Sequence, residues 1–425
     1  MTRKNVETEQ NAIIELFKEG EFLKVVERGQ AFTKQYPQYA IGWNLLALGY
    51  KNSGHRDKAQ KLYEHLIEHN PNNALFLTNL ANLYKEAGRI HDAVKCYQRA
   101  LISDPDLLDT LDGLGLAFTE LGELGKALEC FKKIIELDKE QKLARYHLAN
   151  IYRKLGRYQE AVAHFELTDI GLSKTHQLES IYLLGDKELF FDKFEKLAAG
   201  KKLNPLLGCL SSHAAVRYDS VVANSFCSKP FNCLQHVQIR EEEGFTDDLV
   251  DQILDFHYSD KANYVGQPLL QNGQQSTGNL FLTNHSFVKP LTAMISAKIQ
   301  EYRAKFRDSN EGFIKSWPDN ARLFGWIVSM NKGGKLNSHI HKEGWLSGSL
   351  YLSVPDNINS NEGSIAFSLH GANYPRDGKQ FPPEKVVRVK KGDICLFPSS
   401  LFHYTIPFKS EQERVSFAFD LIPNI

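Results

Sequence analysis

The first half of the chain repeats itself every 34 residues, and this period restricts the possible folds more than any other feature of the sequence. In each unit a glycine ends one helix and permits a tight turn, and in the first three units a proline closes the second helix because it cannot continue the hydrogen-bond ladder. An alanine lets two helices approach closely, and an aromatic residue fills the gap between neighbours. The recurring residues are Gly20, Gly54, Gly88, Gly122 and Gly156, Ala59, Ala93, Ala127 and Ala161, Tyr63, Tyr97, Phe131 and Phe165, and Pro37, Pro71 and Pro105. The first half is therefore predicted to be a stack of helical hairpins.

This pattern resembles the tetratricopeptide repeat, whose unit has the same length. The resemblance covers about residues 6–170, and one unit fills the consensus positions of that family with Trp43, Leu46, Tyr50, Ala59, Tyr63 and Pro71. Residues 176–215 are expected to be degenerate helices that cap the stack, because an open solenoid end exposes apolar surface. The resemblance implies an α-helical solenoid over residues 6–215, followed by a linker at 216–230.

A solenoid of this family presents a concave groove that implies a protein or peptide partner. By the geometry of the family, Asn82 and Asn150 would hydrogen-bond an extended backbone, and Lys51, Lys85 and Arg153 would hold a carboxylate. The alternative is an ordinary solvated surface. We predict no catalysis in this half, because its polar residues are spread along helices instead of converging.

Charge and cysteine content exclude several classes of protein. Lysine plus arginine equals aspartate plus glutamate at 51 each, which gives no support for nucleic acid or an acidic membrane as a partner. No stretch approaches the roughly 18 apolar residues of a membrane span, and the start lacks the apolar core of a secretory signal. The six cysteines form no C-x-x-C pair, so free thiols in a reducing cytoplasm are expected.

From about residue 230 the helical period fades. Two further helices are expected in "REEEGFTDDLVDQILDFH" and "VKPLTAMISAKIQEYRAKF", and after residue 320 short β-type runs alternate with turn chemistry such as "NKGG" and "KKGD". Many short strands without regular helices between them indicate a sandwich or jelly roll. Residues 231–425 are predicted to form this second domain.

One stretch, "NSHIHKEGWLSGSLYL", concentrates metal-binding side chains. His339, His341 and Glu343 stand at every second position, so an extended backbone would place all three on one face. His403 follows a distant strand in "LFPSSLFHYTIP". A non-haem Fe(II) oxygenase needs two histidines and usually a carboxylate on one face of the iron, with the opposite positions open for co-substrate and oxygen.

A basic residue further along completes the pattern. Arg414 and Ser416 lie in "ERVSFAF", with ten residues between His403 and Arg414. The far carboxylate of a 2-oxoglutarate chelated at iron needs a cation deep in the barrel, and the arginine fork suits it. The alternative for Arg414 is a surface ion pair with a neighbouring glutamate.

Together these residues resemble the Fe(II)- and 2-oxoglutarate-dependent dioxygenases, and more narrowly a bacterial and phage group within them. The marks of that group are a histidine pair followed by "SG-x-x-Y", then "FPS" and a histidine, then "ER-x-S", and all are present here. The resemblance implies a double-stranded β-helix, or jelly roll, that uses Fe(II), 2-oxoglutarate and O₂. It assigns the distal carboxylate to Arg414, with Ser416 and Tyr351 as further contacts.

The third metal ligand stays open at this point. His341 and His403 belong to both readings, whereas the usual His-x-acid pattern adds Glu343 and the narrower group adds His339. We favour the histidine pair, because only nine residues separate His341 from Tyr351. A three-histidine site would also keep the charge of the iron at +2 before the co-substrate binds.

The sequence thus predicts a helical tetratricopeptide solenoid followed by a jelly-roll oxygenase. The leading hypothesis is hydroxylation of a protein or peptide that the repeats recruit. One alternative is a non-catalytic repeat scaffold with a degenerate barrel. The other is a cupin-like metalloenzyme that does not use 2-oxoglutarate.

Overall fold

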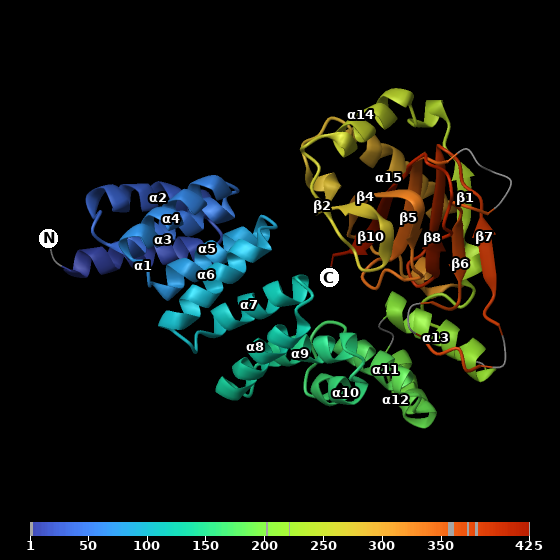
Figure 1. Cartoon of the computed structure of the whole chain (residues 1–425), viewed down its shortest axis with the longest axis horizontal. Helices are drawn as coiled ribbons and strands as arrows, with labels where there is room; N and C mark the ends of the chain where they lie inside the picture. The colour runs from blue at the N-terminus through green and yellow to red at the C-terminus, as the bar shows by residue number, and fades with distance from the viewer. Residues whose placement is uncertain are drawn as a thin grey trace. The chain divides into compact units, whose positions relative to one another are not determined.

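The computed structural model describes residues 3–200, 203–220, 222–355, 361–371, 374–378 and 381–424. Contacts divide the chain into a repeat unit, residues 1–184, and a β-rich unit, residues 185–425 (Figure 1). The predicted order of a helical N-terminal part and a C-terminal part with antiparallel sheets is confirmed. Among the described residues no helix combines the length and the apolar character that crossing a bilayer requires.

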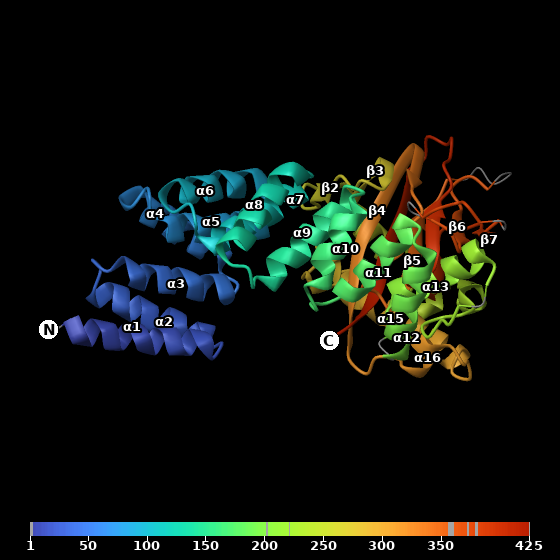
Figure 2. The same cartoon turned by 90° about the horizontal axis from the view of Figure 1, so that it is seen from below.

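The repeat unit is a run of neighbouring helical hairpins (Figure 2). The alanines and aromatics of the repeat are buried between the helices, as their spacing predicts. Gly88 and Gly122 have φ of +75° and +74° at the turns between helices, a conformation that costs glycine no steric strain. The helices are α1 (Arg3–Lys18), α2 (Phe22–Gln35), α3 (Ala40–Asn52), α4 (Arg56–His69), α5 (Ala74–Glu86), α6 (Ile90–Ser103), α7 (Leu108–Glu120), α8 (Leu124–Leu137), α9 (Lys142–Lys154), α10 (Tyr158–Glu166) and α11 (Ser173–Leu184).

The β-rich unit contains a seven-stranded sheet in the order β1-β8-β5-β10-β4-β3-β2 and a three-stranded sheet in the order β7-β6-β9. All of these strand pairs are antiparallel. The chain passes between the sheets from β5 to β6, from β7 to β8, and again on both sides of β9. This alternation is what the predicted jelly roll requires. The strands are β1 (Gln235–Gln238), β2 (Tyr264–Val265), β3 (Leu270–Ser276), β4 (Ala321–Leu336), β5 (Leu346–Ser353), β6 (Ile365–Ser368), β7 (Glu384–Val387), β8 (Asp393–Pro398), β9 (Phe402–Thr405) and β10 (Arg414–Pro423).

Two helices that the sequence predicts, α14 (Asp247–Tyr258) and α15 (Val288–Lys305), pack on the outer face of the larger sheet. Strand β10 shows how the two faces are divided. Its residues Val415, Phe417 and Phe419 join the core beneath these helices, and the residues between them face the other way. The alternation of apolar and polar residues in "RVSFAFD" produces this division, because successive side chains of a strand leave on opposite faces.

The boundary between the units lies at residues 184 and 185. It differs from the sequence-based limits, which assign residues up to 215 to the solenoid and 216–230 to a linker. Helices α12 (Lys187–Ala199) and α13 (Pro205–Tyr218) group instead with the β-rich unit, which also contains the short α16 (Gly312–Lys315). In α13, His213 forms a hydrogen bond with His370, and Arg217 donates a hydrogen bond to Asp377. Both partners lie in the loop after β6.

Candidate metal centre and its cavity

A cavity of about 500 Å³ lies against the inner face of the larger sheet. Alternate residues of β4 and β10 line it, and they face each other as register pairs. The pairs run from Arg414 with Met330 at one end to Ile422 with Arg322 at the other. The cavity therefore has one end at the buried Arg414 and the other end at Arg322 and Ile422.

Three histidines converge on this cavity: His339, His341 and His403 each offer a ring nitrogen, and these atoms lie within 4.8 Å of one another. The backbones of His339 and His403 exchange two N–H···O bonds of 3.1 Å, although these residues belong to distant parts of the chain. This isolated bridge adds the "SHIH" segment to the edge of the three-stranded sheet beside β9. The histidine pair and the third histidine are thus held in a fixed relation by main-chain bonds.

The hydrogen-bond partner of Nδ1 in each ring indicates which tautomer is present. Nδ1 of His339 donates to the carbonyl of Asn337 at 2.9 Å, and Nδ1 of His403 donates to the carbonyl of Leu401 at 3.2 Å. A carbonyl oxygen only accepts, so both Nδ1 atoms carry the proton and both Nε2 atoms carry a lone pair. Nδ1 of His341 has an oxygen partner at 2.6 Å as well, the carboxylate of Asp420.

Two lone pairs then face each other, because Nε2 of His339 and Nε2 of His341 are 3.2 Å apart. Two acceptors at this distance repel unless a cation lies between or beside them. Neutral imidazoles whose other nitrogen is already bonded are the usual ligands of transition metals. The arrangement fits a divalent metal, although three imidazoles alone suit zinc, copper, nickel and iron alike.

Burial keeps two of these rings neutral. Burial lowers the pKa of His339 to about 3, and the neighbouring His341 adds to the shift. Burial also holds the pKa of His403 well below its ordinary value, with His339 and His341 as further causes. Both rings are therefore unprotonated at neutral pH, which is the form that binds a metal.

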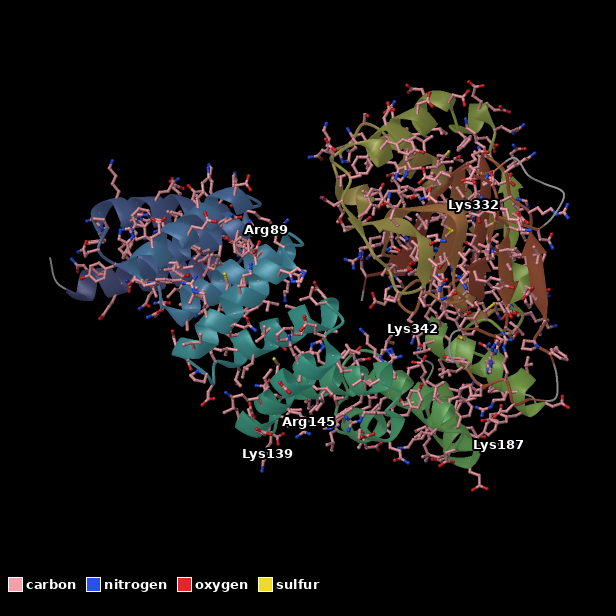
Figure 3. All side chains as sticks on the ribbon, in the orientation of Figure 1. Arg89, Lys139, Arg145, Lys187, Lys332 and Lys342 are labelled. Carbon is pink, nitrogen blue, oxygen red and sulfur yellow. The ribbon has the colours of Figure 1, made fainter. Side chains whose placement is uncertain are left out.

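Glu343, the alternative third ligand, is exposed and lies outside the histidine group. It lines the cavity, as does Lys342, which is labelled in Figure 3. The geometry favours His339, while its role as a ligand remains a proposal. The residue that sequence reasoning missed is Asp420. Its position in alternation with Arg414 on β10 is the one signal that could have indicated it.

Arg414 lies at one end of the cavity with only 2% of its surface exposed. Its Nε donates to the carbonyl of Gly363 at 3.0 Å, and its guanidinium stands 4.9 Å from the ring centroid of Tyr351. No carboxylate of the described residues pairs with it, and burial lowers its pKa. The surface ion pair considered as the alternative is therefore absent from the described part of the chain. A buried charge without a counter-charge is costly, and a bound anion would remove that cost. Ser416 faces the same cavity one register pair further on.

The asparagines predicted for the repeat groove are engaged within their own unit. The side-chain oxygen of Asn82 accepts from the hydroxyl of Tyr97 at 2.5 Å. The side-chain nitrogen of Asn150 donates to the carbonyl of Tyr146 at 3.0 Å. Neither contact excludes a second bond to a peptide, so the assignment stays a prediction.

Two of the three groove cations already hold carboxylates. Lys51 pairs with Glu86 at 2.7 Å, and Arg153 pairs with Glu179 at 3.0 Å. In the described part of the chain Lys85 has no carboxylate within ion-pair distance. A partner carboxylate would have to compete with these internal pairs at the first two positions.

Comparison with known proteins agrees with the two units. Family models for tetratricopeptide repeats match residues 40–73, 72–140 and 113–170, and a model described as "Putative 2OG-Fe(II) oxygenase" matches residues 325–420. None of the curated proteins matches the chain.

Several solved structures resemble parts of the chain, at scores too low to add to the argument. The match to the crystal structure of MamA covers 36% of this chain and 90% of the MamA chain, with 21% sequence identity and a TM-score of 0.33. PilF of Pseudomonas aeruginosa is 16% identical, with coverages of 46% and 91% and a TM-score of 0.42. A tetratricopeptide repeat protein from Parabacteroides merdae is 20% identical, with coverages of 51% and 88% and a TM-score of 0.40. From the family models, the chain carries tetratricopeptide repeats in its N-terminal region and a domain of the 2OG-Fe(II) oxygenase family at residues 325–420.

Proposed function

We propose that the β-rich unit is an Fe(II)- and 2-oxoglutarate-dependent dioxygenase that hydroxylates a protein or peptide recruited by the repeats. The observation that carries the proposal is the pairing, in one cavity, of three converging imidazoles with a buried arginine that has no carboxylate partner among the described residues. The first group suits a metal and the second suits the distal carboxylate of a dicarboxylic co-substrate.

Each residue has a defined task in this proposal. His339, His341 and His403 hold the metal through Nε2, because their Nδ1 atoms are already bonded. When bound, Fe(II) supplies the activation of O₂, in which one oxygen atom enters the substrate and the other enters succinate as 2-oxoglutarate loses CO₂. Arg414 binds the distal carboxylate of 2-oxoglutarate, with the Ser416 hydroxyl as a further donor.

The other end of the cavity would take the substrate. Trp326 stands with its ring 5.6 Å from that of His341, and Phe324 lies 5.8 Å from Trp326. Both side chains line the cavity toward the end marked by Arg322, away from Arg414. An apolar group of the substrate that packs on these rings would be held beside the metal ligands, where the reaction takes place.

The repeats would raise the local concentration of a protein substrate at the oxygenase. This step rests on the presence of both families in one chain. We place the activity in the cytoplasm, with neither nucleic acid nor membrane as a partner, since the charges balance and all six cysteines are free thiols.

Anaerobic titration with Fe(II) and 2-oxoglutarate tests the proposal. Chelation of the metal by the co-substrate is expected to produce a visible charge-transfer band, and the band should be absent from the His403→Ala variant. The Glu343→Ala variant is the matched control and should keep the band. Folded wild-type protein that gives no band with both additions would overturn the oxygenase assignment.

The two alternatives make different predictions. A non-catalytic scaffold would bind peptides through the repeats and form no succinate under any condition. A cupin-like metalloenzyme would bind metal in the same cavity, but its turnover would not depend on 2-oxoglutarate or on Arg414. The burial of Arg414 without a carboxylate partner among the described residues favours the oxygenase over both.

A further inference from the structure

The three histidines differ in what their Nδ1 atoms bond. His339 and His403 donate to backbone carbonyls at 2.9 and 3.2 Å, whereas His341 donates to a carboxylate, Asp420, at 2.6 Å. A hydrogen bond to an ionised acceptor is shorter and about twice as strong as one between neutral groups. The three rings are therefore not equivalent, and His341 is the most strongly polarised of them.

Asp420 is buried and held in place by hydrogen bonds. It is 7% exposed, and the same carboxylate oxygen accepts a 2.7 Å bond from the hydroxyl of Ser347, which in turn bonds Ser399 at 2.7 Å. Both serines are fully buried. Gly344 adds close packing, since a Cβ at that position would lie 3.1 Å from the Asp420 carboxylate.

The buried carboxylate also lacks a full positive charge beside it. Within the described residues its one ionisable partner is His341, and neither lysine nor arginine pairs with it. An isolated buried carboxylate is costly. A divalent metal on Nε2 of His341 would balance it through the ring, whose two nitrogens would then face a cation on one side and an anion on the other.

We propose that Asp420 is a positioning residue that supplies, from outside the coordination sphere, the negative charge that a carboxylate ligand would otherwise give this metal centre. It fixes the tautomer and orientation of His341 and increases the basicity of its Nε2. Glu343, which stands where the acid ligand was considered, is exposed and outside the histidine group. The inference rests on the metal-binding part of the proposed function and not on the use of 2-oxoglutarate.

The test measures metal affinity in the full-length protein without co-substrate. Co²⁺ and Zn²⁺ are titrated under nitrogen against a competing chelator, and the visible spectrum of the Co²⁺ form is recorded. The Asp420→Asn variant keeps an oxygen acceptor of the same shape but removes the charge. It should bind both metals about 10- to 100-fold more weakly, as for other outer partners of ligating histidines. The matched control, Ser399→Ala, removes a neutral hydroxyl that bonds Ser347 at 2.7 Å and should have a much smaller effect.

A second background distinguishes support that acts through His341 from a general effect on the fold. In a His341→Ala background the ring that Asp420 contacts is absent. Asp420→Asn should therefore weaken Co²⁺ binding much less in this background than in the wild type, because the two residues act as a pair. Equal effects of Asp420→Asn in both backgrounds, or an unchanged affinity in the wild type, would overturn the proposal.

A measurement on the wild type keeps the proposal testable if a variant does not fold. In the ¹⁵N-histidine-labelled Zn²⁺ form, Nδ1 of His341 should carry a proton that exchanges with solvent more slowly than those of the other two ligands. A His341 ring that carries no proton at Nδ1 would contradict the proposal. Metal binding without the 2-oxoglutarate band would instead refute the proposed function alone.

Discussion

In the repeat unit Lys51 pairs with Glu86 and Arg153 pairs with Glu179, whereas in the β-rich unit Arg414 has no carboxylate partner among the described residues. Arg89, labelled in Figure 3, is typical of the repeat unit in that it pairs with Asp92 on the adjoining helix α6. Lys51, Arg89 and Arg153 of the repeat unit each hold a carboxylate, while Arg414 is buried and the three histidine Nε2 atoms lack a proton to share. The comparison teaches that polar groups left unsatisfied inside a unit indicate a ligand more reliably than their residue type does.

The largest expected effect concerns the histidines. His339→Ala removes one of three donors and should weaken Co²⁺ binding by more than about 100-fold, beyond what an outer partner contributes. Glu343→Ala, four residues away and exposed, should leave the affinity unchanged. Competition with a chelator measures both variants. If Glu343→Ala weakened Co²⁺ binding and His339→Ala left it unchanged, the usual His-x-acid ligand pair would be in use.

The next effect concerns the buried arginine. Arg414→Met replaces an unpaired buried charge by an apolar chain, so the free energy of unfolding in urea should be equal or higher. Loss of the charged contact should raise KM for 2-oxoglutarate on the order of 100-fold. Succinate formation measures the second quantity. A variant that is strongly destabilised, or that keeps its KM, would mean that Arg414 is a structural residue and that the contrast between the two units is wrong.

The smallest effects are expected in the repeat unit. Arg153→Ala leaves Glu179, whose side chain is 4% exposed, without its cation, and should cost about 1.5–3 kcal/mol in the unfolding of that unit. Lys51→Ala breaks a more exposed pair and should cost at most about 1 kcal/mol. Urea unfolding followed by circular dichroism measures both. Neither variant should alter Co²⁺ affinity, and a change in affinity would show that the metal centre depends on these pairs.

The repeat unit was predictable because its information is local. Each glycine, alanine and aromatic of the period acts within one hairpin or between neighbouring hairpins, so the spacing in the sequence specifies the contact. The ends of the solenoid were not predictable in the same way. Helices α12 and α13 are helical in both interpretations, and contacts such as His213 with His370 decide the unit to which they belong.

The candidate site was predictable where its residues are close in sequence or fit a spaced pattern. His339 and His341 stand two residues apart, and Arg414 follows His403 within a short segment. Asp420 was missed because it meets His341 across 79 positions. Its alternation with Arg414 on one strand is a signal in the sequence, but that signal does not name His341 as its partner. The order in which residues line the cavity from one end to the other likewise depends on the register between β4 and β10.

Strand β10 also has a consequence for the order in which the protein folds. It lies between β5 and β4, and Arg414 pairs with Met330 while Phe419 pairs with Gly348, both far upstream in the chain. Such pairing must wait until long loops have closed, whereas the repeat helices contact their immediate neighbours. Pulse-labelled hydrogen exchange during refolding should therefore show protection in the repeats first and in β10 among the last segments. The helical hairpins would then form before the cavity that holds the three histidines.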